Sequence, residues 1–76
     1  MKETLELIIK SLVTDTESVS INEVAGEKSI VMEVKVAEAD MGKVIGKQGR
    51  IAKAIREVIR AVAAKEQKKV TVEFID

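Results

Sequence analysis

The segment Val44-Ile45-Gly46-Lys47-Gln48-Gly49-Arg50-Ile51 constrains the fold of this chain more than any other part of it. Two glycines bracket two polar residues, an apolar pair precedes them, and an apolar helical pattern follows. Because glycine adopts backbone angles that other residues avoid, the segment predicts a sharp turn that opens directly into a helix. The backbone of such a turn can approach a phosphate chain closely. We therefore treat residues 44–51 as the first candidate for a functional site.

The size and composition of the chain predict one small domain, residues 1–76, near the lower limit for independent folding. Apolar residues make up 46% of the chain, which is enough for one core. The chain has no cysteine, so neither disulfides nor thiolate metal sites can stabilise it. It also has no histidine, and its few serines have no evident base beside them. These absences argue against an enzyme and against a soft metal site.

Apolar spacing predicts the elements before the glycine loop. A first helix is expected from about residue 2 to residue 14, because apolar residues recur there at helical intervals, at Leu5, Ile8, Ile9, Leu12 and Val13. Alternation predicts a short strand around Val19 and Ile21, a turn over residues 25–28 and a second strand over residues 30–37. A short helix from Met41 to Ile45 follows, with Asp40 as its N-terminal cap.

After the loop, a long helix is expected to reach about Lys65. Its core-facing stripe is predicted to be Ile51, Ala54, Ile55, Val58, Ala61 and Val62. Alternation of Val70, Val72 and Phe74 predicts a last strand with the phenyl ring towards the core. The connection between the second and third strands is long enough for a right-handed parallel crossover. The fold class is therefore α+β, in the order α-β-β-α-α-β, with helices packed on one face of a three-stranded mixed sheet.

Charge is segregated along the chain although the net charge is zero. Residues 1–40 contain four basic and nine acidic residues, whereas residues 41–60 contain six basic residues and only one acidic residue, Glu57. Arg50 and Lys53 fall in the first turn of the long helix, where the helix dipole favours acids. Cations at that place indicate a site for an anion, and a polyanion would be oriented onto this face. Arg56 and Arg60 lie further along and equally fit a role in solubility.

Two other glycine motifs can be excluded by their spacing. The phosphate loop of nucleotide hydrolases needs four residues between its glycines, but three separate Gly42 from Gly46, and Gln48 follows Lys47 where Ser or Thr is needed. The dinucleotide fingerprint needs a G-x-G after a strand, which is absent. A helix-turn-helix with the glycine loop as its turn also fits the pattern. Gly42 fits either tight helix packing or a functional contact.

The segment Gly42-Lys43-Val44-Ile45-Gly46-Lys47-Gln48-Gly49-Arg50 resembles the signature of the KH domain, and the order of elements resembles its bacterial, type II arrangement. The resemblance covers essentially the whole chain. Its length makes it similar to the KhpA (YlqC-type) family of small bacterial single-KH proteins. Members of such a family are expected to bind single-stranded RNA, about four nucleotides per glycine loop, with low sequence specificity. They are expected to act as post-transcriptional regulators or RNA chaperones, without a cofactor.

The resemblance implies a role for nine residues in RNA binding. Gly46 and Gly49 would let the nucleic-acid backbone approach, with Lys47 and Gln48 presented to phosphates. Ile45, Ile51 and the edge of the strand over residues 30–36 would form an apolar floor for bases, although a place in the buried core fits Ile45 and Ile51 at least as well. Contacts with phosphates or base edges would come from Lys43, Arg50 and Lys53.

Two alternatives to RNA binding remain open. The loop would also accept single-stranded DNA, since only contacts to the 2′-hydroxyl separate the two. The chain would otherwise be a protein–protein module, because the resemblance implies a homodimer or a heterodimer with KhpB, a larger partner that carries its own KH domain. Ile59, Ala63 and Ala64 are a candidate surface for a second copy, or they complete the packing against the first helix.

The start of the chain and its hydropathy bear on location. Residues 1–4 lack the basic start and uninterrupted apolar run of a signal peptide. No apolar stretch approaches the roughly 18 residues that a bilayer span requires. We therefore expect a cytoplasmic protein.

Overall fold

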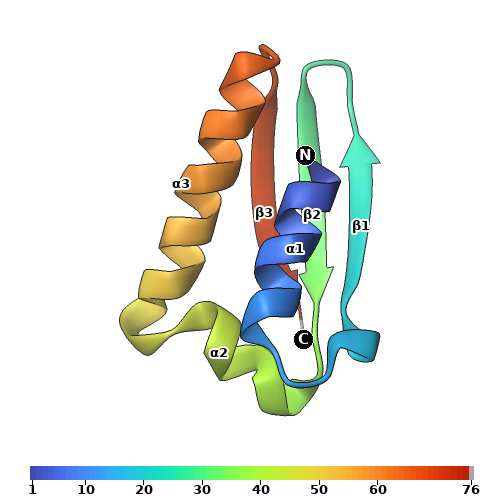
Figure 1. The fold of residues 1–76 in the computed structure, drawn as a ribbon. Helices are drawn as coiled ribbons and strands as arrows, with labels where there is room; N and C mark the ends of the chain where they lie inside the picture. Colours follow the sequence, from blue (N-terminus) through green and yellow to red (C-terminus); the bar gives the residue numbers. More distant parts are fainter. Residues whose placement is uncertain (76) are drawn as a thin grey trace.

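Three strands form one mixed sheet, and the helices pack against one of its faces (Figure 1). The computed structural model describes residues 1–75. The elements follow in the order α1 (Lys2–Leu12), β1 (Ser20–Ala25), β2 (Ser29–Lys35), α2 (Met41–Ile45), α3 (Arg50–Lys65) and β3 (Lys69–Ile75). Short 3-10 turns lie at Thr16–Ser18, Glu38–Asp40 and Lys47–Gly49. The α-β-β-α-α-β order and the α+β class predicted from the sequence are confirmed.

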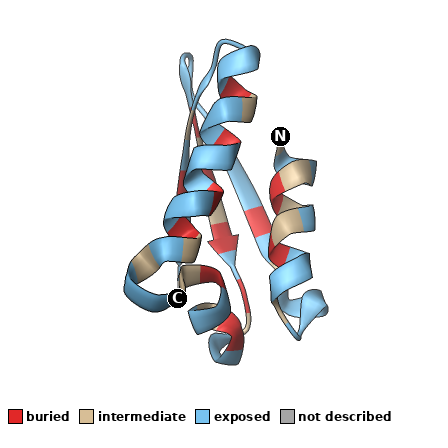
Figure 2. Ribbon diagram, turned by 60° about the vertical axis from the view of Figure 1, so that its left-hand side comes forward, coloured by how far each residue is buried: buried red, intermediate tan, exposed pale blue. Residues whose placement is uncertain are grey.

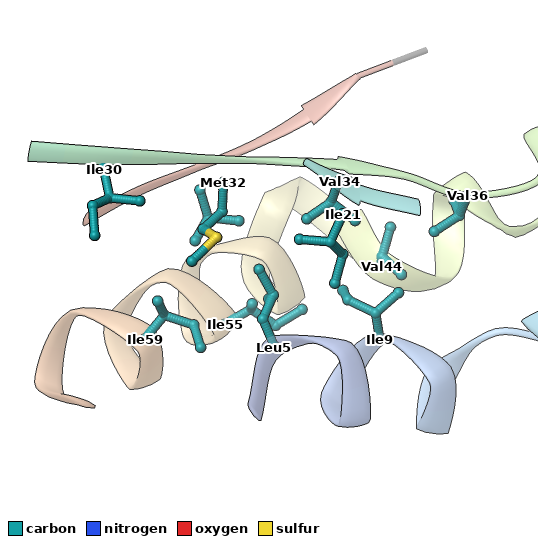
Figure 3. Close-up of a cluster of buried hydrophobic side chains, with 11 residues drawn as sticks. Leu5, Ile9, Ile21, Ile30, Met32, Val34, Val36, Val44, Ile55 and Ile59 are labelled. Atoms are coloured by element: carbon teal, nitrogen blue, oxygen red, sulfur yellow. The ribbon is translucent and has the colours of Figure 1, made fainter. Parts of the chain in front are cut away.

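The sheet has the strand order β1-β2-β3, with β1 antiparallel and β3 parallel to β2. Its register places Ile21, Val34 and Phe74 in one row across the sheet. Met32 and Val72 are adjacent in the next row. The side chains of Met32 and Val34 point towards the helices and are fully buried, as Figure 3 shows. This face of the sheet is therefore one wall of the core, and α1 and α3 supply the other wall.

The central position of β2 overturns one expectation about the site. Both sides of β2 carry hydrogen-bonded partner strands, so the strand has no free edge. Its alternate residues Ile30, Met32 and Val34 are core residues, each no more than 7% exposed. The prediction that the edge of this strand forms a floor for bases is therefore wrong. The free edge on the side of α3 belongs to β3.

The segment between α1 and β1 differs from the prediction at both ends. Helix α1 ends at Leu12 rather than near Thr14, because Val13 is extended and the N–H groups of Thr14 and Asp15 donate to the carboxylate of Asp40. A 3-10 turn then occupies Thr16–Ser18, so β1 begins at Ser20 and continues to Ala25. The contacts that end α1 therefore come from a residue 25 or more positions away.

The face that α3 buries is rotated from the predicted one. Its buried residues are Ala52, Ile55, Ile59 and Ala63, whereas Val58 is 47% exposed and Ala54 and Ala61 are exposed. Ile59 of α3 and Leu5 of α1 both belong to the core between the helices and the sheet (Figure 3). The apolar arc of α3 is wider than the area that α1 and the sheet can cover, so tertiary packing chooses which part is buried. Ile59 and Ala63 are wholly buried, so they cannot form a surface for a second copy, whereas Ala64 is exposed.

Candidate nucleic-acid interface

The loop between α2 and α3 turns through three residues with positive φ. Gly46 has φ 76° and ψ 173°, Gln48 has φ 59° and ψ 24°, and Gly49 has φ 74° and ψ 14°. The N–H of Gly46 donates to the carbonyl of Gly42 at 2.9 Å, and the N–H of Gly49 donates to the carbonyl of Gly46 at 3.2 Å. These two bonds end α2 and close a four-residue turn. The loop is therefore a defined structure that begins α3 without a side-chain cap.

The three glycines of the motif differ in what their surroundings require. A Cβ atom at Gly46 would lie 2.6 Å from Cγ1 of Ile51, closer than atoms can pack. A Cβ atom at Gly49 or Gly42 would meet nothing within 4 Å. Gly46 is thus needed for the packing of Ile51, and Gly49 for its left-handed backbone. Tight helix packing does not explain Gly42, which stands exposed on α2.

Polar and basic side chains surround the loop in solvent. Lys47, Gln48, Arg50 and Lys53 are all exposed. Within residues 1–75, none of these three cations takes part in an ion pair. Nη2 of Arg50 lies 3.5 Å from Oε1 of Gln48, the outer limit of a hydrogen bond. The structure therefore brings the predicted loop cations to one end of the molecule and leaves their charges available to an anion.

Lys43 stands apart from the other predicted cations because its ammonium group already has partners in the protein. Nζ of Lys43 lies 3.1 Å from Oδ1 of Asp40, and it also donates to Oγ1 of Thr14. The side chain is half-exposed, so the ammonium group still reaches solvent. Its charge is balanced by a carboxylate, unlike the charges of Lys47 and Lys53.

Asp40 does not cap α2, contrary to the prediction. Its backbone is already helical and its side chain makes no cap hydrogen bond. The carboxylate accepts instead from the N–H of Asp15 at 2.9 Å and the N–H of Thr14 at 3.1 Å. Those two bonds, together with nearby Lys43, hold the pKa of Asp40 below its ordinary value of 3.8 against the opposing effect of desolvation. Asp40 therefore stays ionised wherever the protein is folded near neutral pH.

The two isoleucines that flank the loop are intermediate in burial. Ile45 and Ile51 both pack against the core cluster, yet each keeps part of its surface accessible. Ile51 fills the space beside Gly46, so a side chain at position 46 would clash with it. Both isoleucines thus serve the core, and their accessible parts lie beside the glycine loop.

Arg56 is a candidate site residue that sequence reasoning left undecided. Its Nε donates to the carbonyl of Val72 in the edge strand β3 at 3.1 Å, and its guanidinium group lies over the ring of Phe74, 5.5 Å from the centroid. The side chain is exposed on the same helix as Arg50 and Lys53. It therefore extends the basic surface from the loop along α3 to the edge of the sheet. Only the excess of basic residues over residues 41–60 pointed to it in the sequence.

Other parts of the described chain offer no competing chemistry near the loop. No three His, Cys, Asp or Glu side chains of residues 1–75 gather as metal ligands. A hollow of about 700 Å³ lies where the β1–β2 turn meets the α3–β3 turn, and it contains no residue of the loop. Among residues 1–75 there is also no helix with the length and apolar character that crossing a membrane requires.

Comparison with known proteins gives relatives that span the full motif. The RNA-binding protein KhpA of Clostridium perfringens is 65% identical over 75 residues, which are 99% of this chain and 100% of that protein. The protein of the same name from Clostridium acetobutylicum is 64% identical over the same shares of both chains. The one from Caldanaerobacter subterraneus is 55% identical, again over 99% and 100%.

The family comparison covers the same extent. No solved structure matches this chain significantly. The family model described as KhpA/KhpB, KH domain, matches residues 2–74. That range includes the whole glycine loop and every helix and strand, apart from Ile75 at the end of β3. The type II KH arrangement seen in the fold and the match to the family agree, and the chain belongs to the KhpA/KhpB family of KH domains.

Proposed function

We propose that this protein binds single-stranded RNA at the loop Gly46-Lys47-Gln48-Gly49, without catalysis. The loop would hold the phosphate backbone of about four nucleotides, as KH loops do. Lys47 and Gln48 would face the phosphates, while Arg50 and Lys53 would contact phosphates or base edges. The accessible parts of Ile45 and Ile51 would lie under the bases, and Lys43 would flank the same groove. The relatives that carry the name RNA-binding protein support the assignment.

The observation that carries the proposal is a hydrogen-bonded, positive-φ loop at the start of α3. Lys47 in this loop and Arg50 and Lys53 after it take part in no ion pair within residues 1–75. The first turn of α3 contains no acidic residue. A helix start without acidic side chains favours a bound anion. Lys47, Arg50 and Lys53 would then exchange their counterions for phosphates, which makes binding strongly dependent on salt.

We expect weak preference for base sequence. The only aromatic residue is Phe74, which is half-buried and lies beneath Arg56, so flat rings for base stacking are missing. Affinity would come mainly from phosphates and from the apolar surface beside the loop. A protein of this kind would act on many transcripts in the cytoplasm, as a post-transcriptional regulator or RNA chaperone.

Fluorescence anisotropy with a labelled RNA of about six nucleotides, slightly longer than the expected clamp of four, tests the proposal. The test variant is Lys47→Asp/Gln48→Asp, which places two carboxylates against the phosphates. The matched control is Gln67→Asp/Lys68→Asp, because it changes the same residue types by the same charge at the other end of α3. Gln67 also has a positive φ, 58°, close to that of Gln48.

Loss of binding in the loop variant and retention in the control would support the loop as the site. Equal loss in both variants would reduce the effect to net charge, and full binding by the loop variant would overturn the assignment. A DNA oligonucleotide of the same sequence separates RNA from single-stranded DNA, because only RNA offers 2′-hydroxyl contacts. Equal affinity for both oligonucleotides would mean that the protein binds single-stranded nucleic acids in general and not RNA specifically.

We further propose that the protein pairs with a second copy, or with a KhpB-type protein, through the exposed side of α3. Val58 is 47% exposed, and Ala54 and Ala61 lie one turn to either side of it on the same face. Alanines beside a valine allow two helices to approach closely, and a twofold axis would bury the same face of both copies. Pairing would add a second RNA site and raise the overall affinity of a weak single site.

Sedimentation velocity tests this pairing with the variant Val58→Glu. The control is Glu57→Gln, which changes an exposed neighbour on α3. A dimer in the parent and the control with a monomer in Val58→Glu would support the proposal. A monomeric parent at concentrations of about 100 μM, where interfaces of standard size are saturated, would exclude the homodimer and leave the heterodimer, which mixing with a KhpB-type protein would test.

A further inference from the structure

One buried charge joins the start of α2 to a distant part of the chain. Asp40 is 2% exposed and is the one charged residue that is buried within residues 1–75. Its carboxylate accepts two backbone N–H bonds from the segment that connects α1 to β1, at Thr14 and Asp15. It also pairs with Lys43, one turn further along α2, and Lys43 donates to Thr14. Three groups from two segments, the N–H groups of Thr14 and Asp15 and the ammonium group of Lys43, therefore meet at one carboxylate.

Stability alone does not require a carboxylate at this place. Burying a charge has a desolvation penalty, and apolar replacements of buried charged groups are often neutral or stabilising. The segment Thr14–Asp15 could instead donate its N–H groups to water, since both residues are exposed. The carboxylate does supply a fixed geometry, because two N–H groups and an ammonium define its position. The arrangement thus fixes where α2 lies relative to the connecting segment.

Helix α2 depends on such links because it is short. Five residues are too few for a helix to persist by itself. Of the five residues of α2, only Val44 is fully buried, and it lies near the C-terminal end of the helix. At the N-terminal end of α2, Met41 is only partly buried against the core, and the Asp40 contacts add a second link there. Movement of the N-terminal end of α2 would also move the loop, because the N–H of Gly46 is bonded to the carbonyl of Gly42 in α2.

We infer that Asp40 is a positioning residue of the RNA site, which holds α2 in place so that the glycine loop keeps its binding geometry before RNA arrives. This inference rests on the proposed function. Asp40 touches no residue of the loop, and it acts through α2. A loop that is held in one geometry binds more tightly than a loop that visits it for part of the time, in proportion to that fraction.

The sign of the effect on RNA affinity separates positioning from electrostatics. Asp40→Asn removes a negative charge close to the basic segment, so charge alone predicts tighter binding to a polyanion. Positioning predicts weaker binding, by about threefold to tenfold if the competent loop falls to between a third and a tenth of the population. Glu38→Gln is the matched control, since Glu38 is exposed two residues earlier and its loss changes the charge equally. Asp40→Glu keeps the charge and displaces the carboxylate.

Affinity would be measured by anisotropy at a temperature where thermal unfolding shows every variant to be folded. We expect Asp40→Asn and Asp40→Glu to bind RNA more weakly than the parent, and Glu38→Gln to bind equally or slightly more tightly. The slope of log affinity against log salt should stay unchanged, because the phosphate contacts remain. Unchanged or tighter binding by both Asp40 variants would overturn the inference. If Asp40→Asn does not fold, the result with Asp40→Glu decides.

Hydrogen exchange of the free protein gives a readout that does not need RNA. The amides of Gly46 and Gly49 are both hydrogen-bonded in the loop, so their exchange reports its opening. We expect both amides to exchange faster in Asp40→Asn than in Glu38→Gln. Equal exchange would overturn the positioning role even if the Asp40 variants bound RNA more weakly. If the parent itself fails to bind RNA, the proposed function fails, and exchange still decides whether Asp40 holds the loop.

Discussion

Gly46 and Gly49 are required in the loop for different structural reasons, and substitutions can separate them. At Gly46 the backbone angles, φ 76° and ψ 173°, belong to a region that glycine alone adopts readily, and Ile51 occupies the space of a side chain. At Gly49 the backbone is left-handed and the space is open. The two positions look equivalent in the sequence, yet their structural requirements differ.

We predict that Gly46→Ala destabilises the fold more than Gly49→Ala. Backbone strain and the clash with Ile51 together should lower the free energy of unfolding by about 2–4 kcal/mol at Gly46. Left-handed backbone alone should lower it by about 1–2 kcal/mol at Gly49. Urea unfolding of both variants measures the difference. Equal losses would mean that Ile51 moves aside without cost.

The carboxylate of Asp40 predicts how stability depends on pH. Its pKa is lowered in the folded protein, chiefly by the N–H groups of Asp15 and Thr14. A lowered carboxyl pKa adds stability above the unfolded value of about 3.8, and this stability is lost as pH falls through the lower folded pKa. The melting temperature of the parent should therefore fall more steeply below pH 4 than that of Asp40→Asn. Parallel curves for the two proteins would contradict the assignment.

Among the elements, α3 shows why a helix can be predicted while its orientation cannot. Ten of its sixteen residues are apolar, so several stripes of similar quality run along it. The sequence indicates the length of the helix, and packing in the core shared with α1 and the sheet chooses the buried stripe (Figure 3). Figure 2 shows the buried positions on one side of α3 and the exposed positions on the other. Val58 and Ile59 are neighbours in sequence and opposites in burial.

This contrast gives a direct test of the orientation of α3. Ile59→Ala should lower the free energy of unfolding by about 2–5 kcal/mol, because it leaves a cavity in a closed core. Val58→Ala should change it by no more than about 0.5 kcal/mol in dilute protein, because the side chain is half-exposed and alanine favours helix. Chemical unfolding at low protein concentration measures both. The reverse order would restore the stripe expected from the sequence.

Local features of the sequence predicted most of the fold and the position of the glycine loop. Strand alternation, the Met41–Ile45 helix and the two glycines each depend on neighbours within a few residues, and the structure has them as expected. Hydrogen bonds between residues far apart in the sequence could not be predicted in this way. Asp40 meets Thr14 and Asp15 across 25 residues or more, and Arg56 meets Val72 across 16. A sequence pattern cannot indicate contacts whose partners are brought together only by the finished fold.

For the molecule as a whole, segregation of charge explains how a neutral protein can attract a polyanion. The basic excess over residues 41–60 lies on α2, the loop and α3, and the acidic excess lies in residues 1–40. The molecule is 34 Å long, several times the screening length of about 8 Å at physiological salt. Acids far from the loop are therefore screened from an RNA phosphate there, and the local charge at the loop decides the attraction.

The most direct test of RNA binding at the loop is an NMR titration of ¹⁵N-labelled protein at physiological salt. The RNA would have about six nucleotides, slightly more than the four that the loop is expected to hold. We predict that amide shifts concentrate at residues 45–53, with smaller changes at Arg56. The turns at residues 26–28 and 66–68, at the other end of the molecule, should stay unchanged. Amide shift changes at those turns, without changes at residues 45–53, would contradict the proposed site.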